Sequence, residues 1–195
     1  MSRGVRVSIM IGEYSRMYVD IIERVLTIEG DYVHHPADRG GQTYRGIARA
    51  FWPQWEGWSL VEQWLSGGDR EEELNQLVLK FYHEHFWQRI RGDALAAVSP
   101  RIAEEVLEAA INCGVSSAVR FLQTALQMNM DSILYPTVVD GVMGPKTLHT
   151  FTRYMSYEPI VMNEQILLNC LNGEQYCFYK ANPKHKVFRG WFLRT

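Results

Sequence analysis

Residues 29–47 constrain the fold most, because this run interrupts a chain whose other segments mostly carry helical signals. From Ser15 to Ile28, apolar residues recur at steps of three and four, which predicts a helix with one apolar face. Gly30 is placed to cap that helix, and Pro36 and the pair Gly40-Gly41 then break the chain into turns or a short irregular hairpin. The prediction is a mainly α fold with one small irregular β or turn insert.

Cap signals and apolar periodicity predict the remaining helices. The expected helices are a short one opened by a capping box at Ser59–Glu62, one capped by Asp69 and running to about Ile90, one begun by Ser99-Pro100 and ending at Ile111, one capped by Ser116 or Ser117 and ending at Gln127, and two over 146–155 and 159–180. A turn from Asp140 to Pro145 is expected before the helix at 146–155.

The composition suits a globular protein and excludes several partners. A length of 195 residues, 47% of them apolar, provides for the core of one domain. A formal net charge of −2 argues against nucleic acid, since phosphate binding needs a basic excess. Three cysteines without Cys-x-x-Cys spacing predict a reducing compartment. No apolar stretch suits a signal peptide or a membrane span, so we expect neither self-export nor membrane insertion.

Residues 29–47 also contain the candidate catalytic residues. Glu29 is followed nine positions later by Asp38, and five positions after that by Thr43. At a helix C-terminus the helix dipole disfavours the ionised form of Glu29, whereas backbone donors in a glycine-rich turn favour the ionised form of Asp38. Two carboxyl groups with opposite proton preferences are the pair that hydrolysis of a glycosidic bond requires, and Thr43 could position a water.

Each of these residues has an ordinary structural explanation when taken alone. Glu29 could be a solvated helix-end residue, and Asp38 a turn residue bonded to nearby backbone. The histidines offer no metal site: His83 and His85 would point to different helix faces, and no third ligand has suitable spacing to join His34 and His35. We therefore expect no metal and no cofactor, and the whole arrangement of Glu, Asp and Thr favours catalysis.

A family resemblance runs through these motifs. The patterns are Glu29-Gly30-x-Tyr32, Pro36-Ala37-Asp38-x-Gly40-Gly41-x-Thr43-x-x-Gly46-Ile47, Phe81-Tyr82-x-x-x-Phe86-Trp87, Ala109-Ala110-Ile111-Asn112-Cys113-Gly114, Leu122-Gln123-x-x-Leu126, Asp140-Gly141-x-x-Gly144-Pro145-x-Thr147-Leu148 and Phe188-Arg189-Gly190-Trp191-x-x-Arg194. Together they resemble glycoside hydrolase family 108, the muramidase-type bacteriophage endolysins and their bacterial relatives. One position departs from that pattern: Asp31 stands where the family usually has a second glycine.

The resemblance implies roles for individual residues. Glu29 corresponds to the essential catalytic glutamate, and the wider lysozyme-like endolysins imply Asp38 and Thr43 as its partners. Asn112 is a candidate for a hydrogen bond to the glycan, although an Asn at a helix end can equally be a C-cap. Tyr32 and Tyr44 are the aromatic candidates for substrate binding, because such rings form stacking platforms for sugars.

The implied organisation is a lysozyme-like catalytic region at 14–113. A helical region at 114–195 would follow it, with a predicted role in peptidoglycan binding, and the two regions are expected to pack into one globular unit. For Ser117 to Phe151, completing the core and capturing substrate remain alternatives.

The expected function is an endolysin-type N-acetylmuramidase, or lysozyme, for lysis of a bacterial host. It would hydrolyse the β-1,4 bond between N-acetylmuramic acid and N-acetylglucosamine in peptidoglycan, and a carboxyl separation of about 6.5–9.5 Å would give inversion. A lytic transglycosylase and a non-catalytic wall-binding protein are the alternatives. We expect a monomer that accumulates in the host cytoplasm and reaches the wall through a holin-type partner.

Overall fold

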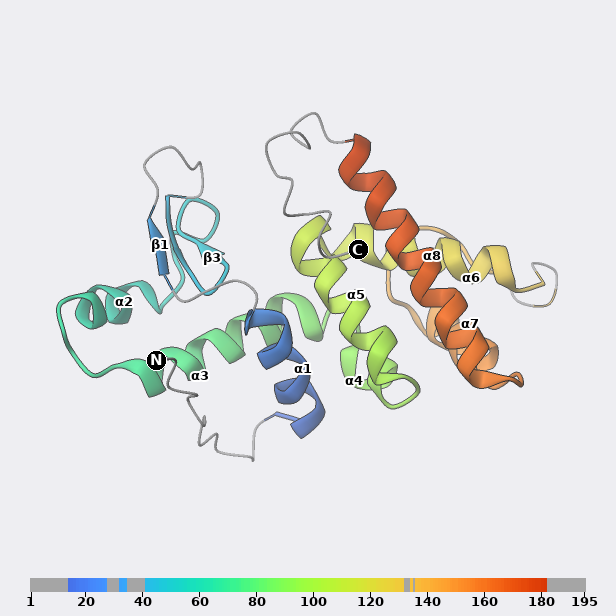
Figure 1. Cartoon of the computed structure of the whole chain (residues 1–195), viewed down its shortest axis with the longest axis horizontal. Helices are drawn as coiled ribbons and strands as arrows, with labels where there is room; N and C mark the ends of the chain where they lie inside the picture. The colour runs from blue at the N-terminus through green and yellow to red at the C-terminus, as the bar shows by residue number, and fades with distance from the viewer. Residues whose placement is uncertain (1–13, 28–31, 35–40, 132–133, 135, 182–195) are drawn as a thin grey trace. The chain divides into compact units, whose positions relative to one another are not determined.

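A computed structural model describes residues 14–27, 32–34, 41–131, 134 and 136–181 of the chain (Figure 1). These residues fall into two compact units, divided between His85 and Phe86. Each unit has its own buried apolar core. None of the helices in the described part of the chain combines the length and the apolar character needed to cross a membrane.

The first unit combines helices with a small sheet (Figure 1). Its elements are α1 (Arg16–Thr27), β1 (Tyr32–His34), β2 (Gln42–Tyr44), β3 (Ile47–Ala48), α2 (Trp58–Leu65) and α3 (Glu71–Tyr82). The three strands pair antiparallel in the order β1-β2-β3. Both α1 and α2 pack against α3. The predicted helix at 15–28 and the predicted irregular hairpin after it are therefore confirmed.

The second unit is helical in its described residues. Its elements are α4 (Gly92–Ala96), α5 (Pro100–Cys113), α6 (Val115–Asn129), α7 (Pro145–Met155) and α8 (Ile160–Ala181). Helix α5 packs against α4, α6 and α8, while α6 also packs against α7 (Figure 1). A π-helical turn, η1 (His83–Trp87), contains the division between the two units. The prediction of a mainly α fold with a small β insert is confirmed.

The predicted start of α5 is also confirmed. The Ser99 hydroxyl accepts a hydrogen bond from the backbone N–H of Ile102 at 3.1 Å, and Pro100 occupies the first turn. Ser99 also donates to the Glu164 carboxylate at 2.6 Å. Because Pro has no N–H to lose in the first turn, Ser99-Pro100 is a strong local start signal that needs no tertiary support.

Three other cap predictions are wrong. The N-cap residues of α2, α3 and α6 are Gly57, Arg70 and Gly114, in place of Ser59, Asp69 and Ser116 or Ser117. None of these three N-caps makes a side-chain cap hydrogen bond. Ser59 is already inside α2, and its hydroxyl donates back to the Glu56 carbonyl at 3.4 Å. The observed N-caps lie one to three residues from the predicted ones, which is close to the range over which helix boundaries vary.

The division into compact units differs in position from the predicted functional regions. It falls between His85 and Phe86, inside residues 14–113. The boundary predicted at 113/114 lies between α5 and α6, which pack together within the second unit. The catalytic and wall-binding assignment of these regions, and their packing into one globular unit, stay predictions.

A buried glutamine organises the turn that precedes α7. The Gln123 amide nitrogen donates to Asp140 Oδ1 at 2.9 Å, to the Val142 carbonyl at 3.1 Å and to Thr147 Oγ1 at 3.1 Å. Its oxygen accepts from the Gly141 N–H at 2.9 Å. Gln123 is fully buried, so one side chain from α6 satisfies four polar groups of the predicted Asp140 to Pro145 turn and the start of α7.

The carboxylate of Glu105 on α5 is hydrogen-bonded to α8. It accepts a 2.5 Å hydrogen bond from the Gln175 amide. Burial, reinforced by the neighbouring carboxylate of Glu108, raises the pKa of Glu105 to about 7. At neutral pH the folded state therefore holds this group half protonated, whereas the unfolded chain ionises it fully.

The raised pKa of Glu105 predicts a pH-dependent stability. The contribution is favourable below the unfolded pKa of 4.5, falls as the pH rises to about 7, and is constant above that. Glu105→Gln should remove this slope, which amounts to roughly 3 kcal/mol at most. Urea unfolding at pH 5 and pH 8 measures it, with Glu158→Gln as an exposed control in the same unit. An unchanged slope in Glu105→Gln would contradict the assignment.

Candidate active site

Helix α3 holds two segments of the first unit through tyrosine hydroxyls. Tyr18 of α1 donates to the Leu79 carbonyl at 2.6 Å, and Tyr82 of α3 donates to the Arg45 carbonyl at 2.7 Å. Burial raises the pKa of Tyr18, so its hydroxyl remains a donor throughout the physiological range. Helix α1, which precedes the Glu29 motif in sequence, and the turn after Thr43 are thus bonded to the same helix.

The β2–β3 turn has the geometry of a tight hairpin. Arg45 has φ +43° and Gly46 has φ +78°, the two positive values of a type I′ turn. The Arg45 guanidinium donates to Asn75 Oδ1 on α3 at 2.6 Å. This bond and the one from Tyr82 hold a non-glycine residue in the left-handed region, and so fix the register of Tyr44 opposite Ile47.

Strand alternation separates Thr43 from its aromatic neighbours. Thr43 pairs with Val33 on β1 and with Ala48 on β3, so these three residues share one face of the sheet. Thr43 is half-buried and Val33 is 51% exposed, which makes this the open face. A hydroxyl on an open sheet face is accessible to a water or a substrate. Its predicted catalytic role stays a prediction.

Tyr44 lies on the opposite face and is 2% exposed. Its ring stacks on Trp55 with centroids 6.2 Å apart and meets the edge of Trp64 at 5.9 Å. A role for Tyr44 in substrate binding stays a prediction, but its ring is enclosed by these neighbours. The cause is strand alternation, which turns residue 44 toward the core once residue 43 faces outward. Tyr32, its half-buried partner on β1, stays a candidate for substrate binding.

The two predicted carboxyl groups, Glu29 and Asp38, lie outside the described residues, and so does Asp31. Their distance from Thr43 and the stereochemical outcome it would predict therefore stay open as predictions.

Asn112 belongs to the second unit. It lies in the last turn of α5 and is half-buried. The C-cap of α5 is Gly114 with φ +89°, so the C-cap interpretation of Asn112 is wrong. Glycine takes the cap because the chain turns there directly into α6, through a conformation that costs a side-chain-bearing residue energy. A role for Asn112 in substrate binding stays a prediction.

Sequence reasoning missed a polar network beside Thr43. The Arg49 guanidinium donates to Gln42 Oε1 at 2.6 Å and to the Glu62 carboxylate at 2.8 Å, and it lies over the Trp58 ring at 5.2 Å from the centroid. The backbone N–H of Arg49 also donates to the Gln42 carbonyl at 2.8 Å. Arg49 therefore ties the start of β2, next to Thr43, to α2.

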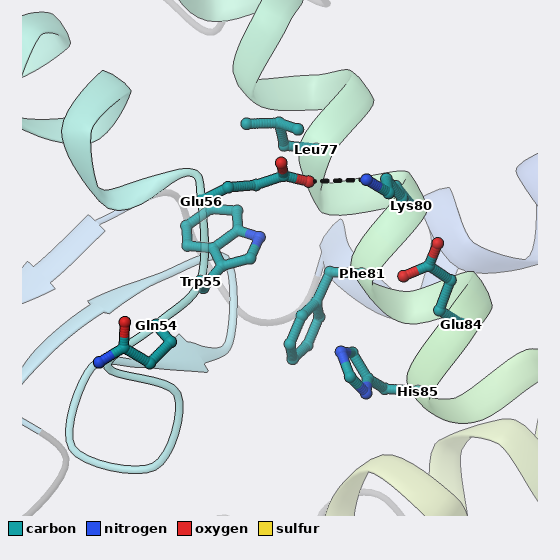
Figure 2. A pocket seen from close by; sticks show the side chains of 8 residues that line it. All are labelled: Gln54, Trp55, Glu56, Leu77, Lys80, Phe81, Glu84 and His85. Carbon is teal, nitrogen blue, oxygen red and sulfur yellow. Dashed lines mark hydrogen bonds and ion pairs between the residues drawn. The ribbon is translucent and has the colours of Figure 1, made fainter.

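Two adjoining cavities of about 250 and 370 Å³ form an aromatic groove, which sequence reasoning also missed. Figure 2 shows residues from the segment after β3 facing residues from α3 and η1. The residues that line the aromatic groove are Phe51, Trp52, Pro53, Gln54, Trp55, Glu56, Leu77, Lys80, Phe81, Glu84 and His85. The available signal was the density of aromatics directly after the motif, Phe51-Trp52-Pro53-Gln54-Trp55.

The two histidines of η1 enter different ring clusters. His85 lies between Trp52 and Phe81, with centroids 4.5 and 4.7 Å away. His83 contacts Tyr14 and Tyr18 at 4.7 and 5.0 Å. Within the described ranges, no three His, Cys, Asp or Glu side chains gather as a metal ion would require.

Comparison with known proteins adds to this geometry. Residues 22–114 match the family model described as glycosyl hydrolase 108, a span that contains the motif from Glu29 to Ile47. The chain is also similar to the solved structure of Brucella abortus SagA, with 27% identity over 91% of this chain and 88% of that chain and a TM-score of 0.64. No curated protein matches. The predicted lysozyme-like fold is confirmed, whereas the resemblance beyond residue 114 to a peptidoglycan-binding region stays a prediction.

Proposed function

Because residues 22–114 belong to the glycosyl hydrolase 108 family, we propose that this glycoside hydrolase is a muramidase. Its substrate would be the β-1,4 bond between N-acetylmuramic acid and N-acetylglucosamine in bacterial peptidoglycan. The observation that carries the proposal is the match over the segment holding the complete Glu, Asp and Thr motif. The likeness to SagA, which extends over both units, supports the same family assignment.

In the proposed mechanism Glu29 protonates the leaving glycosidic oxygen, while Asp38 and Thr43 orient a water on the opposite face of the sugar. Among the described residues, Thr43 supports this scheme because it lies on the open face of the sheet. Its strand is fixed by Arg49 at the start and by the turn at Arg45 and Gly46 at the end. Such fixation is what a water-positioning group needs, since small displacements of a catalytic group cost large factors in rate.

The proposed biological role is that of an endolysin. The chain would act as a monomer on the glycan strands of the host wall, with a holin-type partner giving it access from the cytoplasm.

The chemistry of the products tests the reaction type. Hydrolysis adds water across the bond and leaves a reducing N-acetylmuramic acid end, whereas a lytic transglycosylase forms an intramolecular 1,6-anhydro ring. Mass spectrometry of digested, purified peptidoglycan separates these products, and we expect reducing ends. Anhydro ends would contradict hydrolysis, and an undigested wall would favour a non-catalytic wall-binding protein.

A further inference from the structure

The aromatic groove of the first unit has no role in the proposed mechanism, and its walls come from two segments. One is the loop that holds Phe51 to Glu56, and the other is the C-terminal half of α3 with η1 (Figure 2). All the lining residues belong to the first unit. The groove is therefore a property of that unit alone.

Two rings of the groove, those of Trp52 and Trp55, pack against neighbouring aromatic rings. Trp52 and Phe81 form a T-shaped pair with ring centroids 4.8 Å apart, and Trp55 and Trp58 form another at 5.2 Å. Phe51, at one end of the groove, is 72% exposed, whereas Trp52 and Trp55 are half-buried. Aromatic surface that is packed before a ligand arrives loses little entropy on binding, so Trp52 and Trp55 form a preorganised platform.

The charges of the groove do not favour an anion. The Lys80 ammonium and the Glu56 carboxylate are 2.9 Å apart, and this hydrogen bond raises the pKa of Lys80 (Figure 2). Glu84 adds a second carboxylate to the lining. Two carboxylates against one ammonium leave the groove without positive charge for phosphate or polyanion binding.

The combination of an aromatic floor and a polar rim fits a neutral sugar. A pyranose ring presents C–H groups to an aromatic face and hydroxyl or amide groups at its edge. Phe51, Trp52 and Trp55 can contact the first kind, and Gln54 and Glu84 can bond to the second. An apolar peptide helix would instead need a continuous apolar groove, which the charged residues Glu56, Lys80 and Glu84 interrupt.

We infer that this groove is a glycan-binding subsite, which binds neutral N-acetylated pyranose rings through Phe51, Trp52 and Trp55. The choice of glycan rests on the proposed function, but the binding itself does not require hydrolysis.

Titration with N-acetylated chitotetraose tests the subsite. The protein carries Glu29→Gln to suppress cleavage, and the indole N–H resonances of Trp52 and Trp55 are followed by NMR. We expect both resonances to shift, and Phe51→Ala to weaken the Kd obtained from these shifts about five- to tenfold. Phe51 is 72% exposed, so its replacement should leave the thermal midpoint unchanged.

Leu65→Ala is the matched control, because Leu65 is an exposed apolar residue of the same unit at 47% and lies outside the groove. It should bind the tetrasaccharide like the parent protein. Unshifted Trp52 and Trp55 resonances, or a Phe51→Ala protein whose Kd stays within twofold, would overturn the subsite. Neither result bears on hydrolysis. That activity is measured separately, from the products that the parent protein, with Glu29 intact, releases from peptidoglycan.

Discussion

Glu29→Gln is expected to lower the rate of peptidoglycan hydrolysis by about 10²–10⁴-fold, the usual contribution of a positioned general acid. Glutamine keeps the length and the hydrogen-bonding shape of the side chain but has no acidic proton to give to the leaving oxygen. Binding of the glycan should be retained, because the substitution removes a proton donor and leaves the binding surfaces unchanged. Turbidity of outer-membrane-permeabilised cells and release of soluble muropeptides are the two measurements.

The matched control for this prediction is Glu23→Gln. Glu23 is an exposed glutamate on α1, six positions before Glu29 in the sequence, and has no part in the proposed mechanism. Its replacement should leave the hydrolysis rate within about twofold of the parent. Lysis that survives Glu29→Gln would show the catalytic assignment of Glu29 to be wrong.

Gln123→Leu is expected to destabilise the second unit by about 3–4 kcal/mol, roughly 1 kcal/mol for each hydrogen bond lost. Leucine has a similar volume but satisfies none of the four polar groups that the amide now serves. Thr147, which is 5% exposed, would lose this partner inside the core. The Gly141 N–H would lose the side-chain oxygen that accepts its hydrogen bond.

Urea unfolding followed by circular dichroism measures this effect as a lower midpoint of the transition that reports on the second unit. Gln165→Leu is the control. The Gln165 side chain is exposed, and its amide donates to the exposed Asn169 side chain at 3.0 Å. That change should alter stability by less than about 0.5 kcal/mol. Equal midpoints for the two variants would mean that the turn before α7 holds its shape without Gln123.

Local signals predicted much of the helical framework. The apolar periodicity of residues 15–28 and the pair Ser99-Pro100 both lead to the observed helices, because each depends on residues within one or two turns. The turn at Asp140 to Pro145 was predicted for a similar reason, since glycine and proline restrict the backbone locally. The family motif, in turn, located the candidate catalytic residues.

Features that depend on long-range packing were not predicted. The burial of Tyr44 follows from strand register together with Trp55 and Trp64, which lie in other parts of the unit. The aromatic groove needs the loop after β3 to face α3, and no periodicity encodes that arrangement. Glu29 and Asp38, which the sequence motif identified, lie outside the described residues.

The two tyrosine hydroxyl bonds that link α3 to α1 and to the β2–β3 turn have a consequence for how this sequence can change. Both acceptors, at Leu79 and Arg45, are main-chain carbonyls, which every amino acid supplies. Side chains at these two positions can therefore change over evolutionary time without removing the hydrogen-bond acceptor, provided that the backbone keeps its path. Only the tyrosines themselves, at positions 18 and 82, are irreplaceable for these two bonds. For these two bonds alone, sensitivity to substitution should thus lie with the donor positions and not with the acceptor positions.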